Sequence, residues 1–253
     1  MYSTRLVLLL AIFLVGCVSP GAPSPAQPTA APGVETPTPS QGTAAEAIRY
    51  TCDAPPGFPL SVLDQPAVAE LEVSPWAESL RRALTNELPA DEFPRSGYWL
   101  VGRGPVRADY VARSAGGDSF VYASFEVQGG IWTLSGYGGC RPTRVLDGLS
   151  LATWMLDPAL PPPDAAETRI TALVTERACA SGKQMGARLQ PPSMDYGADA
   201  ITIVFSARPL AGGQDCPGNP STRVVVQLRE ALGDRRLLDG AFFPPADPSA
   251  PAS

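Results

Sequence analysis

One stretch near the N-terminus cannot contribute to a folded core. Val18–Ala47 consists mainly of Pro, Ala, Ser, Thr and Gly, carries few charges and offers no large side chain to bury. Such a segment cannot offset the entropy lost on ordering, so we expect it to stay extended and disordered. As a flexible coil it would span roughly 30 Å. The fold is therefore confined to residues from about Tyr50 onwards, and residues 17–49 are predicted to be a tether.

The residues before this stretch are typical of a secretory signal. Arg5 supplies a positive charge, and Leu6–Val15 is apolar but too short for a membrane-spanning helix, which needs about 20 residues. Leu14–Cys17 (LVGC) resembles the lipobox of bacterial lipoproteins. The resemblance implies that residues 1–16 are a signal peptide, that Cys17 is diacylated, and that the lipid anchors the chain to the bacterial cell membrane. The alternative is an ordinary signal peptide, or an uncleaved anchor, with an incidental cysteine.

Four further cysteines follow the tether: Cys52, Cys140, Cys179 and Cys216. Four cysteines outside the cytoplasm are typical of two disulfides, for which three pairings exist. The domain boundary given below favours Cys52 with Cys140 and Cys179 with Cys216. Metal binding is disfavoured, because the sequence holds no C-x-x-C pair and the spacings match no zinc pattern.

Composition excludes several classes of function. The chain has no histidine, which removes Ser-His-Asp and Cys-His nucleophilic sites and His-ligated zinc, haem or copper. Lys and Arg number 19 against 25 Asp and Glu, a formal charge of -6, so no nucleic-acid partner is expected. We predict no catalytic residue, no metal site and no cofactor.

Residues 50–156 are predicted to form an α+β domain, a helix on an antiparallel meander. Ser74 and Pro75 are typical of a helix start, and apolar residues follow at intervals of four until Pro89. After Pro94 the hydrophobic period changes to two, which is typical of strands. Four strands are expected, at 98–101, 108–113, 119–127 and 131–137.

A second domain is predicted for residues 165–243. The proline run Pro158–Pro163 marks the boundary. Beyond it, alternation of apolar and polar residues and Pro/Gly-rich turns favour a small all-β, sandwich-like or open-barrel domain. Its strands are expected at 169–175, 200–207 and 223–228, with shorter ones at 187–190 and 236–238. The tail 244–253 is expected to be disordered.

Several residue groups suggest a site only weakly. An exposed aromatic face could stack on a sugar or a peptide, although packing is the favoured interpretation of Trp99, Trp132, Tyr137 and Trp154. Loop carboxylates could bind calcium or act as an acid/base pair, although solvated loop positions are favoured for Asp195, Asp199 and Asp215. The glycine-rich segment 136–141 lacks the spacing of a phosphate-binding loop, and 181–183 lacks that of a serine–lysine dyad.

The functional hypothesis rests on the predicted export signal and lipid anchor rather than on a catalytic or binding site. The segments 175–182 (TERACASG) and 216–220 (CPGNP) are similar to secreted proteins of GC-rich bacteria, a likeness that carries no activity. We expect an extracytoplasmic, lipid-anchored cell-envelope protein with a non-catalytic binding or structural ectodomain and an envelope protein or glycan as ligand. The alternative is a carboxylate-dependent hydrolase of cell-wall glycan, in which Asp109, Asp118 or Glu126 would have to converge in a cleft.

Overall fold

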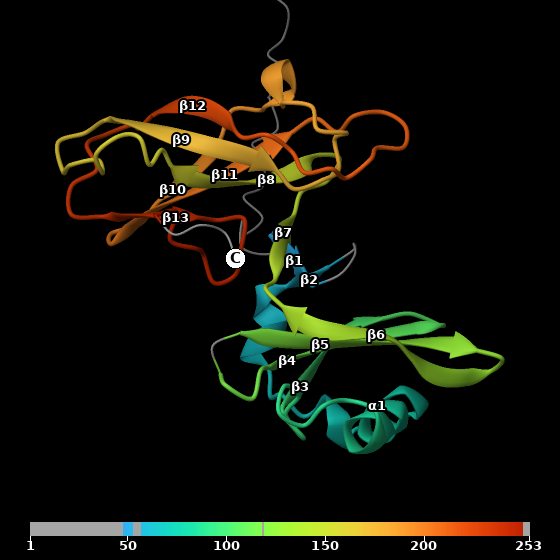
Figure 1. Ribbon diagram of the computed structural model, residues 1–253. Helices are drawn as coiled ribbons and strands as arrows, with labels where there is room; N and C mark the ends of the chain where they lie inside the picture. The colour runs from blue at the N-terminus through green and yellow to red at the C-terminus, as the bar shows by residue number, and fades with distance from the viewer. Residues whose placement is uncertain (1–47, 53–56, 118, 250–253) are drawn as a thin grey trace, which may run out of the picture. The chain divides into compact units, whose positions relative to one another are not determined.

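The computed structural model describes residues 48–52, 57–117 and 119–249 (Figure 1). The predicted signal peptide, nearly all of the tether, Cys17, Asp118 and the last four residues lie outside these ranges. Strands make up 41% and helices 12% of the structure. Within the described ranges, no helix has the length and apolar character needed to cross a membrane.

The predicted α+β class is wrong, because the described part of the chain is mostly β. The described part contains one α-helix, α1 (Pro75–Asn86), beside three sheets of three, four and six strands. The description as a helix on a meander fails for a physical reason. The segment before α1 forms two short strands and a 3-10 turn at Leu60–Asp64, none of them predicted, and these pack against the sheet face opposite α1. The sandwich-like domain expected for the second half agrees in part with its six-stranded sheet.

Helix α1 begins and ends as its sequence indicates. The Ser74 hydroxyl accepts a hydrogen bond from the Ala77 backbone N–H at 3.2 Å, and Pro75 occupies the first helical position. The buried face of α1 includes Leu80 and Leu84, which pack in one core cluster with strand residues of the neighbouring sheet. The helix therefore gains its stability from this apolar face rather than from its length.

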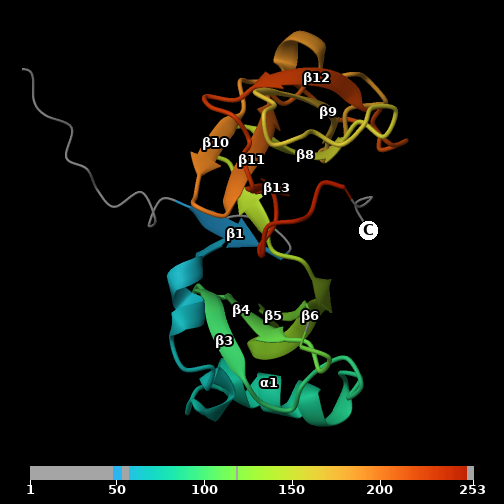
Figure 2. The same cartoon turned by 90° about the vertical axis from the view of Figure 1, so that its left-hand side faces the viewer.

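The four-stranded sheet is antiparallel throughout and follows chain order. Its strands are β3 (Tyr98–Arg103), β4 (Arg107–Arg113), β5 (Phe120–Gln128) and β6 (Ile131–Cys140). Alternate residues of β4 and β5 face opposite sides. One side buries Ala108, Tyr110 and Phe125 with the helix, and the other presents Val111 and Phe120 to a second core. Figures 1 and 2 show α1 along the first of these faces.

A small three-stranded sheet lies against the second face. Its strand order is β2-β1-β7, all antiparallel, with β1 at Arg49–Thr51, β2 at Phe58–Pro59 and β7 at Thr143–Val145. Tyr50 and Phe58 of this sheet share a core with Val111 and Phe120 of the larger one. Strand β7 is thus paired with residues almost a hundred positions earlier in the chain, a contact that no local pattern signals.

The six-stranded sheet has the order β10-β11-β8-β9-β12, with β13 parallel to β11 (Figure 2). Its strands are β8 (Ser150–Leu156), β9 (Arg169–Glu176), β10 (Ser193–Tyr196), β11 (Ala200–Ala207), β12 (Thr222–Gln227) and β13 (Arg236–Asp239). Because β8 pairs with both β9 and β11, the prolines Pro158–Pro163 connect two strands of one sheet. The strand expected at 187–190 is instead a 3-10 turn at Gly186–Arg188 followed by one isolated bridge residue, Leu189.

The described part of the C-terminal tail is hydrogen bonded to this sheet. Asp239 and Ala246 exchange two backbone hydrogen bonds of 2.8 and 2.9 Å, and the Leu156 N–H donates to the Pro248 carbonyl at 2.9 Å. Residues 244–249, expected to be disordered, therefore continue the fold as far as it is described.

Candidate functional site

The register of β4 and β5 brings four polar side chains together on one sheet face. Arg107 lies opposite Glu126, and Asp109 lies opposite Ser124. Within each strand the two residues are two positions apart, so all four side chains point to the same side. This is the face that carries Val111 and Phe120 towards the second core. The four residues form the polar cluster referred to below.

Arg107 holds the polar cluster together. Its Nε donates to both Asp109 oxygens at 2.9 and 3.1 Å, and its Nη1 donates to Glu126 Oε1 at 3.1 Å. The Ser124 hydroxyl donates to Asp109 Oδ1 at 2.7 Å, and Arg107 Nη2 lies 3.4 Å from the same hydroxyl. The side chains of Arg107, Asp109 and Glu126 are 37%, 30% and 43% exposed, so water screens these ion pairs only in part.

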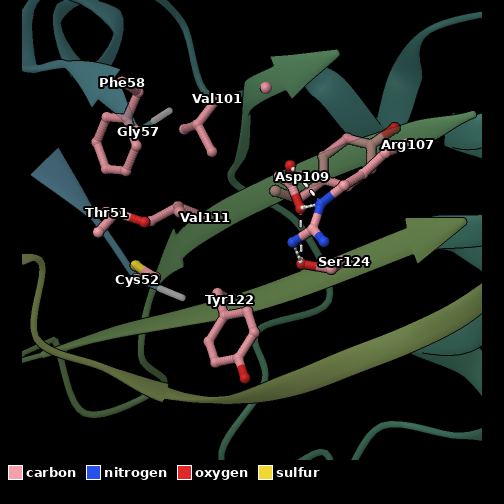
Figure 3. Close-up of a pocket in the computed structure, with 12 residues that line it drawn as sticks. Thr51, Cys52, Gly57, Phe58, Val101, Arg107, Asp109, Val111, Tyr122 and Ser124 are labelled. Carbon is pink, nitrogen blue, oxygen red and sulfur yellow. Dashed lines mark hydrogen bonds and ion pairs between the residues drawn. The ribbon is translucent and has the colours of Figure 1, made fainter. Parts of the chain in front are cut away.

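A small cavity opens beside the polar cluster (Figure 3). Its volume is about 50 Å³, and its lining comes from the three-stranded sheet and from β3, β4 and β5: Thr51, Cys52, Gly57, Phe58, Val101, Gly102, Arg107, Asp109, Tyr110, Val111, Tyr122 and Ser124. Gly102 lies close to the polar cluster, because a Cβ at this position would lie 3.0 Å from Asp109 Oδ2 and would require that carboxylate to shift. Ligand pockets usually measure about 300–1,000 Å³, so this cavity accommodates a few waters rather than a sugar ring.

The structure brings together two of the three carboxylates that the hydrolase alternative requires. Asp109 and Glu126 converge, and Asp118 lies outside the described residues. The Arg107 guanidinium group contacts both carboxylates, Asp109 at 2.9 Å and Glu126 at 3.1 Å. General acid/base work on a glycan requires a free acid and room for the sugar between the two groups. In the arrangement observed, neither carboxylate is free, because both are paired with Arg107.

Both predicted disulfides are present, with the favoured pairing. Cys52 is bonded to Cys140 and Cys179 to Cys216, with Cα–Cα distances of 5.3 and 4.7 Å. One disulfide joins the start of the described chain to the end of β6, and the other closes a loop that follows β9. Disulfides persist in oxidising compartments, which indicates an extracytoplasmic domain.

The four aromatic residues considered from the sequence do not form one exposed face. Trp154 is buried and donates to the Ile203 carbonyl, and Trp99 donates to the Gln65 carbonyl. Trp132 packs edge-on against Trp76. Tyr137 is 51% exposed, and its ring contacts that of Phe93. These side chains are engaged in packing contacts, in agreement with the interpretation favoured from the sequence.

The three aspartates considered from the sequence are not gathered into a site. Asp195 lies in β10, Asp199 in the turn before β11, and Asp215 beside the Cys179–Cys216 disulfide. Across the described ranges, no group of three or more His, Cys, Asp or Glu residues is placed to hold a metal ion.

A larger groove of about 760 Å³ runs along β8 and β9. Pro158, Pro161, Pro162 and Pro163 form part of its wall, together with Leu160 and Val225. The one fully buried charge in it, Asp157, pairs with Arg223 at 2.6 Å. The groove has the size of a ligand site, and its polar lining consists of Asp157, Asp164, Glu167, Arg169, Thr171 and Ser249.

Sequence reasoning missed two clusters of arginines over aromatic rings. Arg229 and Arg235 lie over Tyr196, and Arg141 and Arg177 lie over Phe242. The second cluster joins residues from three separate segments. No spacing or motif could have signalled it, because only the pairing of distant strands brings the residues together.

No known protein family matches the chain, and no curated protein and no solved structure is similar to it.

Proposed function

We propose that this chain is a cell-envelope lipoprotein whose disulfide-bonded ectodomain is a non-catalytic binding or structural module. The observation that carries the proposal is the pair of disulfides, which indicates an oxidising compartment for a chain with a lipobox-like segment near its start. Two or three acyl groups on Cys17 would suffice for a stable membrane anchor, which a single chain does not provide.

Three observations support a binding or structural role over catalysis. The Asp109 and Glu126 carboxylates are both held by Arg107. The cavity beside them is too small to enclose a sugar. The chain also lacks histidine, the most frequent general acid/base residue.

Acyl labelling of Cys17 tests the anchor. Cells that express the full chain are fed a palmitate analogue and then fractionated. We expect label and protein in the membrane fraction for the wild type and for the control Ser19→Ala. Cys17→Ala should lose the label and leave the membrane. A Cys17→Ala chain that stays labelled and membrane-bound contradicts the proposal.

Digestion of purified cell-wall glycan tests the absence of catalysis. We expect the wild-type chain to release no more reducing ends than buffer does. Release by the wild type that disappears in Asp109→Asn, while Asp195→Asn retains it, would establish the hydrolase alternative instead.

A further inference from the structure

Two aromatic rings each carry a pair of arginines. The guanidinium carbons of Arg229 and Arg235 lie 4.2 and 5.7 Å from the centroid of the Tyr196 ring. Those of Arg141 and Arg177 lie 4.1 and 5.3 Å from the centroid of Phe242. The ring attracts each cation, but the two positive charges repel each other, and the charge of Arg141 accordingly lowers the pKa of Arg177. An anion beside such a pair therefore stabilises it.

At the Tyr196 cluster the chain supplies that anion itself. Glu230 accepts a hydrogen bond of 2.8 Å from Arg235 Nη1, and the same Oε1 lies 3.7 Å from Arg229 Nη2. The hydrogen bond from Arg235, with a smaller effect of Arg229, holds the pKa of Glu230 below its usual range. One carboxylate thus serves both guanidinium groups.

At the Phe242 cluster the corresponding anion is missing from the described chain. The side chains of Arg141 and Arg177 make no hydrogen bond or ion pair with any residue that the structure describes. The carboxylate that acts on them electrostatically is Asp239, which is 2% exposed and whose two oxygens accept the backbone N–H groups of Ala241 and Trp154. Burial lowers the pKa of Arg177, and the charge of Arg141 adds to this effect, while Asp239 opposes it.

The backbone around Arg141 is held in place from both sides. Cys140 before it is bonded to Cys52, and Pro142 after it accepts a hydrogen bond of 2.8 Å from the Phe243 N–H. The next residue, Thr143, forms an isolated β-bridge with Phe242. The segments that carry Arg141 and Phe242 are therefore joined to each other by backbone hydrogen bonds.

The backbone around Arg177 is fixed equally well. Its own N–H donates to the Leu151 carbonyl at 3.0 Å. The Asn219 side chain donates to the carbonyls of Glu176 and Ala178, at 2.9 and 2.6 Å, which flank Arg177 on either side. The disulfide of Cys179 follows two residues later. Because the backbone at both arginines is already held in place, ligand binding orders only the two side chains and costs little backbone entropy.

We propose that Arg141 and Arg177 bind a phosphate group of an external ligand beside the Phe242 ring, in the position that Glu230 occupies at the Tyr196 cluster. Guanidinium groups recognise phosphate through charge-assisted, bidentate hydrogen bonds. A phosphate offers more oxygens and more negative charge than a carboxylate, so it uses both guanidinium groups at once. The inference rests on the binding role proposed above but not on the lipid anchor.

Protection from phenylglyoxal, which modifies free guanidinium groups, tests this site residue by residue. The full-length chain in a non-ionic detergent is modified with and without inorganic phosphate at constant ionic strength, and peptide mass spectrometry follows each arginine. We expect phosphate to slow modification of Arg141 and Arg177 saturably, by about fivefold at four times the dissociation constant. Chloride at the same ionic strength should leave both rates unchanged.

Two variants distinguish a shared site from general screening. Arg141→Gln should abolish the protection of Arg177, because the phosphate loses its second guanidinium group. The control is Arg229→Gln, which removes an arginine that lies over the Tyr196 ring as Arg141 lies over the Phe242 ring. This variant should leave the protection of Arg177 intact. Absence of protection, equal protection of all exposed arginines, or unchanged protection of Arg177 in Arg141→Gln would overturn the proposal.

The source of the phosphate is resolved with vesicles. The chain is reconstituted in phosphatidylglycerol or in phosphatidylcholine vesicles without added phosphate. Protection of Arg141 and Arg177 by phosphatidylglycerol alone identifies a lipid headgroup, and protection by inorganic phosphate but by neither vesicle identifies a soluble ligand. Both results support the site. Because protection is read at the arginines and the anchor is read at Cys17, either claim can fail while the other holds.

Discussion

Asp239 should make the folded domain less stable as the pH rises from about 4 to about 6. The side chain is almost fully buried. Burial raises its pKa from 3.8 to about 6, although the N–H groups of Ala241 and Trp154 and the charges of Arg141 and Arg177 act in the opposite direction. A carboxyl whose folded-state pKa is raised binds its proton more tightly in the folded chain. Its stabilising contribution is therefore complete below the unfolded pKa and is lost as pH rises through the folded pKa.

The size of the effect follows from the difference between the two pKa values. A difference of about two pH units corresponds to about 3 kcal/mol in the free energy of unfolding. Urea unfolding at several pH values, with the disulfides intact, measures it. The comparison is with Asp239→Asn, which cannot ionise. This variant turns an amide towards a backbone N–H and is less stable throughout, so the readout is the pH dependence and not the absolute stability.

The other carboxylates are present in both the wild type and Asp239→Asn, so their contributions to the pH dependence of stability cancel in the comparison. The pKa values of Glu230 and Asp247 are lowered by hydrogen bonds from Arg235 and Ser249, so these groups stabilise the fold as pH rises. We expect the stability of the wild type relative to Asp239→Asn to fall by about 2 kcal/mol between pH 4 and pH 6.5, because the carboxyl is already partly ionised in the unfolded chain at pH 4. A difference that stays constant or increases over this range would refute the reasoning.

Three further predictions concern stability, each measured by urea unfolding. Arg188→Met should cost about 3–5 kcal/mol, because Glu176, whose side chain is 2% exposed, loses its bidentate partner; a loss below about 1 kcal/mol would contradict this. Replacing both members of the Cys179–Cys216 disulfide by serine should cost about 4 kcal/mol, from the closure entropy of a loop with a sequence separation of 37; unchanged stability would argue against that loop constraint. Gly240→Ala should cost about 1–3 kcal/mol, because its Cβ would lie 2.6 and 2.7 Å from two methyl groups of β11, whereas the control Gly213→Ala meets no atom within 4 Å; equal effects would contradict this account.

Local patterns predicted the regular elements well where one face is buried. The helix at Pro75–Asn86 follows from a serine cap, a first-turn proline and apolar residues four apart. Strand β11 was predicted at its observed limits, Ala200–Ala207, because apolar and polar residues alternate along it. These signals are written in neighbouring residues, so a single sequence can show them.

Elements that depend on distant partners were not predictable in this way. β1 and β2 are too short to show a period, and their strand character comes from pairing with each other and with β7. β8 was missed because its residues do not alternate clearly in sequence and it takes its place from β9 and β11. The α+β expectation failed for the same reason. The helix has a clear local signal, whereas β1, β2, β7 and β8 have none, so the sequence underestimates the share of strands.

The candidate sites also differ in whether neighbouring residues or only distant contacts reveal them. Cysteine count and position predicted both disulfides. The sequence offered Asp109 and Glu126 as carboxylates but not their shared contact with Arg107, because that contact depends on the register of β4 with β5. The arginine pair over Phe242 depends on three segments and had no local signal at all.

Mass spectrometry of the N-terminal peptide of the membrane-extracted protein tests the central claim most directly. We expect the mature chain to begin at Cys17 and this residue to carry a diacylglycerol group. A mature chain that begins at any other residue, or an unmodified Cys17, would contradict it.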